Sequence, residues 1–406
     1  MAQNEKYNSP LPLFDSIEFI KAQKPPSHLK HLAKKDFFIT KKFLESYSGR
    51  TGTFNSYRRE TERLLHWCNH IANKSLKQLK PEDIESFVLF CQNPSASWIG
   101  TSMVQKFLTK KAVRIPNEQW RPFVATISKF EAKKGEKVKI DDYELSQGAI
   151  KELFAILSSF YNYLLQEEYA KINPVALIKQ KSKFIRKSHG KTKIRRLSTT
   201  QWQYVIKVAE TLANKNPKQH ERTLFIMSAL YSMYLRISEL CDSERWTPLM
   251  SDFKSDNNNK WWFTTVGKGN KERDIAVSNS MLESLKRWRN YLGLSPLPPP
   301  SDNSPLLPKT KGKGAMKSIT QIRIIVQKCF DKAAEELKKN NLHEEADSLE
   351  SATVHWLRHT GISDDVKHRP REHVRDDAGH SSSATTDKYI DIDLQERHKS
   401  AESKTI

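Results

Sequence analysis

The sequence predicts a mainly α-helical protein with one small β-sheet, divided into two domains. Apolar residues recur at helical spacing through most of the 406 residues, which favours amphipathic helices. One pair of β-rich segments flanks a glycine-containing turn in the second half, and a basic run divides the chain near its middle. The length suffices for two or three domains that each bury a hydrophobic core.

The first domain is expected over residues 36–178, as an all-helical bundle. Residues 1–35 precede it and contain four prolines with little periodicity, so we expect a loose N-terminal arm there. Pro81 marks a helix start, because proline is tolerated in the first turn and the acids after it favour the positive end of the helix dipole. The segment 147–169 carries leucines and aromatics on one helical face. The segment 93–143 is less regular and fits no element of this pattern.

A basic linker is expected over residues 179–196. It contains nine lysines and arginines and no acidic residue. Fully extended, it would reach on the order of 60 Å. Like charges repel one another, and contact with the phosphates of a nucleic acid relieves that repulsion. A solvated linker that contacts nothing is the alternative.

The second domain is expected over residues 197–396, with helices around one β-hairpin, and a tail follows over 397–406. Ser198 and Thr199 are candidate N-caps of its first helix. The expected elements are, in order, a helix over 201–213, a buried helix over 224–240, strands over 261–266 and 274–277, helices over 280–292 and 320–339 on either side of a proline-rich loop over 295–314, and a solvated acidic connection over 343–350.

The charge balance indicates a polyanionic partner. The chain has 68 lysines and arginines against 47 aspartates and glutamates, a formal net charge of +21. Basic side chains displace counterions from nucleic-acid phosphates, so a nucleic acid is favoured over the alternative of a basic protein that is merely soluble.

The sequence also predicts a cytoplasmic location. No stretch of about 18 apolar residues indicates a transmembrane helix, and residues 1–10 lack the basic and apolar regions of a signal peptide. The four cysteines are far apart and stand in apolar helical contexts, which is typical of reduced core residues.

Six side chains suit one chemistry, the attack on a phosphodiester. Arginine offers fixed, permanently charged donors to phosphate oxygens, lysine or histidine can protonate a leaving oxygen, and tyrosine can act as the nucleophile. The phenol pKa is ~10, so neighbouring cations or a base must help to remove its proton. The chain supplies these groups in the order Arg236, Lys268, His355, Arg358, His380 and Tyr389.

Four motifs around these residues resemble those of the tyrosine recombinase (phage integrase) family. They are Leu235-Arg236-Ile237-Ser238-Glu239-Leu240, then Gly267-Lys268-Gly269-Asn270-Lys271-Glu272-Arg273, then His355 with Arg358-His359, and finally Gly379-His380-Ser381-Ser382 followed by Tyr389. Each motif alone is weak, but all four in this order over residues 197–396 make the resemblance specific. The helical first half resembles, less specifically, the family's DNA-binding core-binding domain, and the second half its α+β catalytic domain.

The resemblance implies how the phosphate is held and how the cut end leaves. Arg236 and Arg358 would clamp the scissile phosphate, and Lys268 would protonate the leaving 5′-oxygen as general acid. Lys271 and Arg273 are the other basic residues of the hairpin motif, and they are the alternatives to Lys268 for this role. Because a phosphotyrosine keeps the energy of the cut bond, neither ATP nor a metal nor another cofactor is implied.

The resemblance also implies the covalent step. His355 would assist proton transfer at the tyrosine, and His380 would bond to the phosphate. Tyr389 would attack, which gives a 3′-phosphotyrosine and a free 5′-hydroxyl, and the strand is later joined to a different 5′-end. A packing role alone is the alternative for Tyr389. His359 stands one residue off the motif, so we expect it to be structural.

The function implied is that of a site-specific recombinase or integrase of double-stranded DNA. It would act as a homotetramer on paired sites, for the integration or excision of a mobile element. One alternative is an enzyme like a type IB topoisomerase, which uses similar residues on one duplex. The other is a DNA-binding protein with an inactive site.

Two places depart from the family pattern, and Arg236 has an alternative explanation that is purely structural. Tyr234 stands where the family often has glycine, so the backbone there is expected to differ. Residues 364–377 are more polar than usual and Pro370 breaks any helix through them, which predicts an exposed helix pair or a surface loop. The structural alternative for Arg236 is that it is only the buried ion-pair partner of Glu239.

Overall fold

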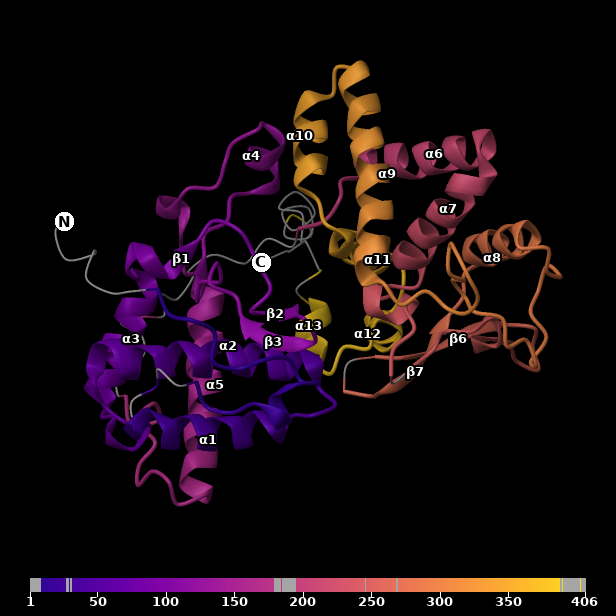
Figure 1. The fold of residues 1–406 in the computed structure, drawn as a ribbon. Helices are drawn as coiled ribbons and strands as arrows, with labels where there is room; N and C mark the ends of the chain where they lie inside the picture. Colours follow the sequence, from indigo (N-terminus) through magenta and orange to yellow (C-terminus); the bar gives the residue numbers. More distant parts are fainter. Residues whose placement is uncertain are drawn as a thin grey trace. The chain divides into compact units, whose positions relative to one another are not determined.

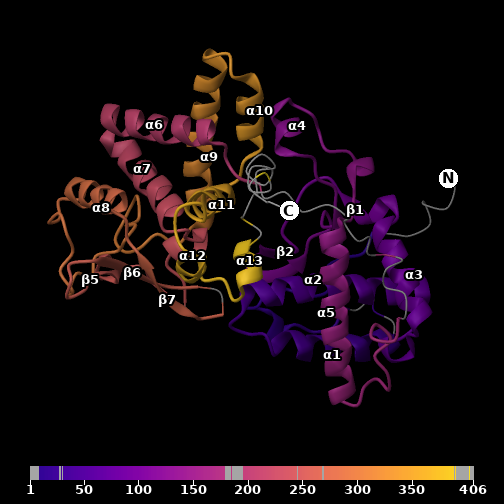
Figure 2. The ribbon, with the colours of Figure 1, turned by 180° about the vertical axis from the view of Figure 1, so that it is seen from behind.

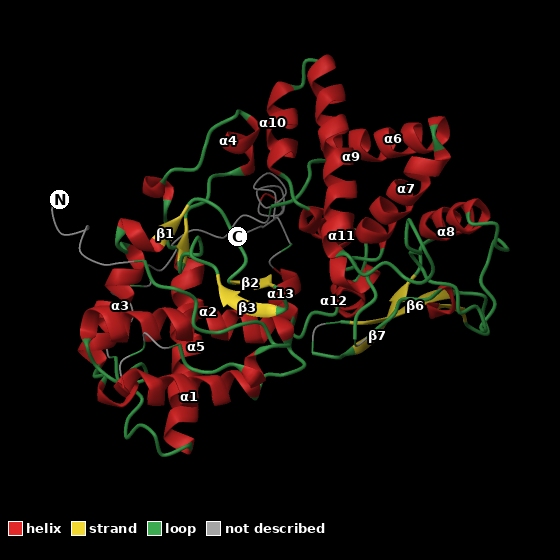
Figure 3. Ribbon diagram, in the orientation of Figure 1, coloured by secondary structure: helices red, strands yellow, loops and turns green. Residues whose placement is uncertain are grey.

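The computed structural model describes residues 9–26, 29, 31–178, 184, 195–244, 246–267, 269–387, 389 and 402. The chain forms two compact units, Met1–Lys191 (unit 1) and Thr192–Ile406 (unit 2), and the division falls within the predicted basic linker (Figures 1 and 2). Helices dominate both units and the sheets are small (Figure 3), which confirms the predicted mainly α fold class. The finer domain boundaries stay predictions.

Unit 1 is built on helices that enclose an apolar core. Phe43, Leu64 and Phe160 are among its fully or nearly fully buried residues. The helix expected at Pro81 begins there, with two acids in its first turn. The helices are α1 (His31–Glu45), α2 (Thr51–Trp67), α3 (Pro81–Gln92), α4 (Lys129–Lys133) and α5 (Gln147–Gln166).

The irregular stretch 93–143 contains four short strands that the sequence did not predict. β1 (Ile99–Gly100) pairs in parallel with β4 (Phe123–Val124). β2 (Phe107–Lys110) and β3 (Val113–Pro116) form an antiparallel hairpin. Strands of two to four residues carry too little alternation of apolar and polar residues to stand out from a loop.

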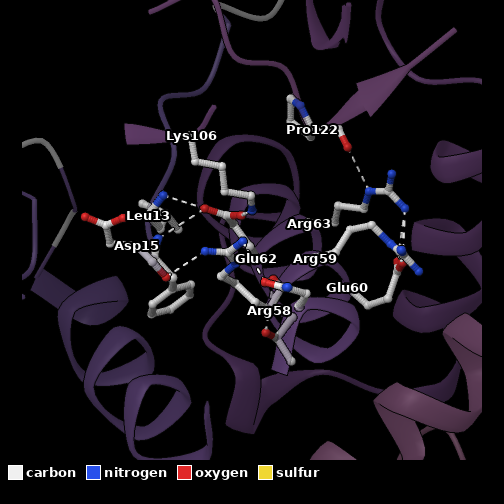
Figure 4. Close-up of polar contacts among 12 residues, drawn as sticks. Leu13, Asp15, Arg58, Arg59, Glu60, Glu62, Arg63, Lys106 and Pro122 are labelled. Atoms are coloured by element: carbon white, nitrogen blue, oxygen red, sulfur yellow. Dashed lines mark hydrogen bonds and ion pairs between the residues drawn. The ribbon is translucent and has the colours of Figure 1, made fainter. Parts of the chain in front are cut away.

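The expected loose arm is wrong for residues 9–26, which pack into unit 1. Leu13 and Phe14 are fully buried, and the Phe14 ring stacks on Phe37 at a centroid distance of 4.9 Å. The Leu13 amide donates to Glu62 at 2.5 Å (Figure 4). A few apolar residues between prolines are therefore enough to fix this segment by burial, with only the short 3-10 helix Ile20–Ala22 as a regular element.

Most of the predicted linker 179–196 lies outside the described residues. Within it, Phe184 is buried in the core of unit 1, with its ring 6.0 Å from that of Phe154. Arg195 and Arg196 lead into unit 2.

Unit 2 follows the expected order of helices up to residue 339, and further helices follow. Ser198 caps the first helix as predicted, because its hydroxyl accepts from the Gln201 amide at 3.1 Å. The acidic connection expected over 343–350 is instead a helix, which buries Ala346 and Leu349. The helices are α6 (Thr199–Lys215), α7 (Pro217–Ser232), α8 (Asn279–Tyr291), α9 (Ile319–Lys339), α10 (His343–Ser351), α11 (Val354–Asp365), α12 (Arg371–Ala378) and α13 (Ser383–Asp387).

The predicted hairpin forms two strands, one central and one at the edge, of a three-stranded antiparallel sheet in unit 2. Its strands are β5 (Phe253–Ser255), β6 (Trp261–Val266) and β7 (Glu272–Ala276), in the order β5-β6-β7. Phe263 lies opposite Ile275, and both are fully buried. Among the described residues, no helix has the length and apolar character that crossing a membrane requires.

Candidate active site

The site begins where α7 ends. The buried helix expected over 224–240 stops at Ser232, because Tyr234 adopts a left-handed backbone conformation with φ of 49°. Glycine reaches this conformation at the lowest cost, so the turn is the one a glycine would favour although tyrosine occupies it. The Tyr234 hydroxyl donates to Asp365 and accepts from Arg369 at 2.9 Å, which anchors the side chain.

Glu239 gathers two arginines beside this turn. Arg236 donates its amide and its Nη1 to the Glu239 carboxylate, at 2.8 and 2.9 Å. Arg273 on β7 donates Nη1 and Nη2 to the same carboxylate, at 3.0 and 2.8 Å. Burial raises the pKa of Glu239, but its bonds to Arg273 and Arg236 outweigh burial and lower the pKa overall. The alternative ion pair of Arg236 is thus present, yet 28% of the Arg236 side chain stays exposed.

Arg358 lies on α11 and is almost fully buried. Its guanidinium donates to the carbonyl of Tyr234 and, at 2.6 Å, to that of Ala378. Its Nη2 is 3.3 Å from His380 Nε2. Burial, followed by the charge of Arg236, lowers the pKa of Arg358 to about 10. The Arg358 side chain therefore contacts the backbone at the ends of α7 and α12 and the side chain of His380.

Glycine at two positions makes room for these arginines. A Cβ at Gly267 would lie 2.9 Å from Arg273 Nη1 and 3.2 Å from Arg236 Nη1. A Cβ at Gly379, whose φ is 64°, would lie 2.8 Å from Arg273 Cδ. Crowding by the arginine side chains thus explains why glycine occupies these two positions in the predicted motifs.

Tyr389 lies against this cluster and is only 7% exposed. Its hydroxyl is 2.6 Å from His359 Nδ1. The His380 ring stacks on the Tyr389 ring at a centroid distance of 5.7 Å, and His380 Nδ1 is 2.9 Å from Thr386 Oγ1. The phenol is therefore held by one histidine at its oxygen and by another on its ring face.

The protonation states suit a proton transfer from the phenol. Burial first, then neighbouring charges, lower the pKa of both His359 and His380 to about 4. Burial raises the pKa of Tyr389, against the opposing charges of Arg358 and Arg236. At neutral pH the phenol therefore keeps its proton, and His359 is an uncharged acceptor for it.

The structure brings most of the predicted residues together. Arg358 contacts His380, and His380 stacks on Tyr389. Arg236 lies close enough for its charge to lower the pKa of Arg358. His355 is exposed, and its ring is 4.3 Å from that of His359. Lys268 lies outside the described residues. The roles predicted for these residues stay predictions.

The contacts of His359 and Arg273 in the structure differ from what the sequence led us to expect of these two residues. His359 was expected to be structural, but it is the histidine that contacts the Tyr389 hydroxyl. A signal existed, because His355 and His359 are four residues apart and share a helix face. Arg273 was a competitor of Lys268, but its guanidinium points inward to Glu239 and to the Asp377 carbonyl, at 2.9 Å.

The polar segment 364–377 is a helix pair rather than a surface loop. α11 ends at Asp365, and Pro370 precedes the first residue of α12, as its helix-breaking character predicts. Arg369 bridges Asp365 at 3.1 Å and Asp377 at 2.6 Å. The unusual polarity therefore serves an ion-pair network that supports Tyr234 and the end of α12.

Known proteins are similar in sequence to this chain. Residues 195–396 match the model of the phage integrase family. The tyrosine recombinase XerC of Actinobacillus pleuropneumoniae serotype 7 (strain AP76) is 28% identical over 244 residues, which are 59% of this chain and 66% of the relative. XerC of Xanthomonas axonopodis pv. citri (strain 306) is 27% identical over 171 residues, 42% of this chain and 47% of the relative. The matches thus span about half to two thirds of these two relatives.

A solved structure shares the fold of the whole chain. It is the XerH site-specific recombinase bound to its palindromic difH substrate, in a post-cleavage complex. The two chains superpose with a TM-score of 0.54 at 15% identity, over 95% of this chain and 93% of the other. At this identity the likeness establishes the fold, which is that of a tyrosine recombinase.

Proposed function

Because the chain belongs to the phage integrase family of tyrosine recombinases, we propose that it is a site-specific recombinase that cleaves and rejoins DNA through a 3′-phosphotyrosine. The observation that carries this proposal is the contact of 2.6 Å between the Tyr389 hydroxyl and His359, next to a cluster of arginines. A phenol, a neutral proton acceptor and surplus positive charge are what attack on a phosphodiester requires.

The arginines supply the charge. Among the described residues, Glu239 is the one carboxylate that Arg236, Arg273 and Arg358 contact, so the cluster keeps a positive surplus. A scissile phosphate carries one negative charge and gains more in the transition state, which preorganised donors stabilise. Arg236 is the most exposed of the three and has donors left for phosphate oxygens.

The covalent step then proceeds without a cofactor. The Tyr389 oxygen attacks the phosphorus as its proton passes to His359 Nδ1, and the bond to the 5′-oxygen breaks. The leaving oxygen takes a proton from Lys268, which the sequence places between two glycines of the β6–β7 turn. His380 bonds to the phosphate, and His355 assists the proton transfer through its position beside His359. Rejoining reverses these steps with a different 5′-hydroxyl.

The partner in this proposal is double-stranded DNA. The net charge of +21 supports a polyanion, and the predicted basic linker would contact the duplex backbone. A homotetramer on paired sites would exchange the strands, for the integration or excision of a mobile element.

A nicked suicide substrate tests the proposal, because the released fragment cannot diffuse back and the covalent complex accumulates. The wild-type chain should form a protein–DNA adduct that resists denaturation, and Tyr389→Phe should form none. An adduct with Tyr389→Phe would refute the assignment of the nucleophile. Relaxation of a supercoiled plasmid that lacks paired sites would instead favour the topoisomerase alternative, and no adduct with either chain would favour a DNA-binding protein.

A further inference from the structure

The backbone at Tyr234 is strained, and the strain lies at the candidate active site. Its φ of 49° is in the left-handed region, where a Cβ comes too close to the following carbonyl oxygen. Among the described residues of unit 2, the other non-glycine residues with positive φ are three asparagines, whose short polar side chains tolerate this conformation: Asn259, Asn270 and Asn341. A bulky residue keeps such a conformation only where its surroundings fix it, so the contacts of Tyr234 must do so.

The Tyr234 hydroxyl is fixed by two charged groups. It donates to Asp365, the last residue of α11, and accepts from Arg369 Nη1 at 2.9 Å. Burial raises the pKa of Tyr234 and the charge of Asp365 raises it further, so the hydroxyl keeps its proton at neutral pH. Hydrogen bonds to charged groups are about twice as strong as those between neutral groups, so this anchor suffices to keep a strained turn in place.

Arg369 is itself fixed by α12 and β7. Its Nη2 donates to one carboxylate oxygen of Asp377 at 2.6 Å, and the other oxygen accepts from the Ala276 amide at 3.3 Å. The Asp377 side chain is only 7% exposed, so its position follows from the packing of α12 beside β7. The anchor of the Tyr234 hydroxyl therefore ends in the backbone of a strand.

The Tyr234 carbonyl is one of two backbone oxygens that orient Arg358. It accepts from Arg358 Nη1, and the Ala378 carbonyl accepts from Nη2 at 2.6 Å. The same Nη2 lies 3.3 Å from His380 Nε2. Because one oxygen contacts each terminal nitrogen, rotation of the peptide after Tyr234 would turn the guanidinium away from His380.

Tyr234 also shares a small apolar cluster with the proposed nucleophile, Tyr389. The other buried members of this cluster are Ile362, Val374 and Ala378, and the cluster is separate from the main core of unit 2. The residue that contacts Arg358 through its backbone therefore packs, through its ring, in the cluster that contains Tyr389.

We propose that Tyr234 is a positioning residue for Arg358: its anchored hydroxyl holds the left-handed turn, and the turn holds the carbonyl that orients the guanidinium. The proposal rests on the proposed function for the role of Arg358 at the scissile phosphate. A displaced guanidinium slows the chemical step more than it weakens DNA binding, because a shift of about 1 Å at a reacting group costs about 100-fold in rate. A role in packing alone would lower the melting temperature and leave the rate of the chemical step unchanged well below it.

The first test compares Tyr234→Phe with Tyr231→Phe on the nicked suicide substrate, with protein in excess and well below both melting temperatures. Tyr231 is the matched control, because its hydroxyl also donates to a carboxylate of α11, Asp364 at 3.0 Å, but it lies within the regular backbone of α7. Tyr234→Phe should form the adduct about 10- to 100-fold more slowly than the wild type at unchanged duplex affinity. Tyr231→Phe should match the wild type, and equal rates in the two variants would overturn the proposal.

A second pair of variants separates the turn from its anchor. Tyr234→Gly and Tyr234→Ala both remove the ring and the hydroxyl, and they differ only in the Cβ that strains a left-handed residue. Glycine keeps the turn without an anchor, so Tyr234→Gly should form the adduct severalfold faster than Tyr234→Ala. Equal rates in these two chains would mean that the conformation of the turn does not orient Arg358.

A third measurement needs no DNA cleavage. Burial and then the charge of Arg358 lower the pKa of His380 to about 4. An Arg358 side chain released from the Tyr234 carbonyl should let His380 titrate at a higher pH. NMR of histidine labelled with carbon-13, with the His380 signal assigned by its absence in His380→Asn, should show this rise in Tyr234→Phe and not in Tyr231→Phe.

The His380 titration also separates this proposal from the proposed function. Equal His380 titrations in Tyr234→Phe and Tyr231→Phe would contradict the positioning role of Tyr234, whether or not the wild-type chain cleaves DNA. A wild-type chain that forms no Tyr389-dependent adduct but shows the rise in Tyr234→Phe would contradict the recombinase proposal and leave the positioning of Arg358 supported.

Discussion

At the scale of single residues, the decisive contact joins Tyr389 to His359. The family resemblance gives the role at the tyrosine to His355, which is exposed, whereas His359 is the one at hydrogen-bond distance from the hydroxyl. Both stand on one face of α11 beside Arg358. The contact distances therefore favour His359 over His355 as the acceptor of the phenol proton.

His359→Ala should slow adduct formation on the nicked substrate by about 100- to 10,000-fold, the range for loss of a positioned base. His355→Ala should have a smaller effect, because its ring contacts His359 and not the phenol oxygen. Raising the pH should partly restore the His359→Ala chain, since hydroxide then removes the phenol proton. A larger loss in His355→Ala than in His359→Ala would return the acceptor role to His355.

The two half-buried histidines, His359 and His380, should make unit 2 less stable in acid. Their pKa falls from 6.5 to about 4 on folding, so between these values the unfolded chain binds protons that the folded chain does not. This contribution to stability is complete above pH 6.5 and is lost as the pH falls toward 4. Thermal melting across this range should show the loss, and it should be smaller in His380→Asn. An equal loss in both chains would mean that His380 is not responsible.

At the scale of elements, close packing of α11 on α7 sets the site. A Cβ at Gly361 would lie only 2.1 Å from the backbone oxygen of Tyr231, so the two helices touch through their backbones. This approach places Arg358 against the carbonyl of Tyr234 at the end of α7. A left-handed tyrosine at that end, anchored by Asp365 and Arg369, completes the turn.

Gly361→Ala should lower the free energy of unfolding by about 1–3 kcal/mol or more, because a backbone atom cannot move aside as a flexible side chain does. The matched control is Gly148→Ala in α5, where the nearest atom, Ser146 Oγ, would be 3.8 Å from the added Cβ. That change should be neutral or stabilise by about 0.4–1 kcal/mol. Denaturant unfolding measures both, and equal stabilities would contradict the close approach of α11 to α7.

At the scale of the whole molecule, the two units have separate cores and separate concentrations of positive charge. Unit 2 gathers arginines around Glu239 and Tyr389, and unit 1 gathers cations around a cleft. Both units have more basic than acidic residues, so both contribute to the net charge of +21.

Long periodic elements were predicted well, and short or aperiodic ones were not. The helices at Pro81 and over 147–169 and the hairpin around Gly267 appear as expected. The four strands in 93–143 and the packed segment 9–26 do not follow from pattern, because they hold their place through tertiary burial.

Residue types and their local spacing set which candidate site residues the chain carries, the order in which they occur and its positive net charge. Tertiary packing was needed to bring His359 to Tyr389 across 30 residues and Arg114 to Asp15 across 99 residues. It also decided that Tyr234 takes a left-handed turn. Contacts between distant residues depend on how helices and strands pack, and no local pattern of apolar and polar residues encodes that packing.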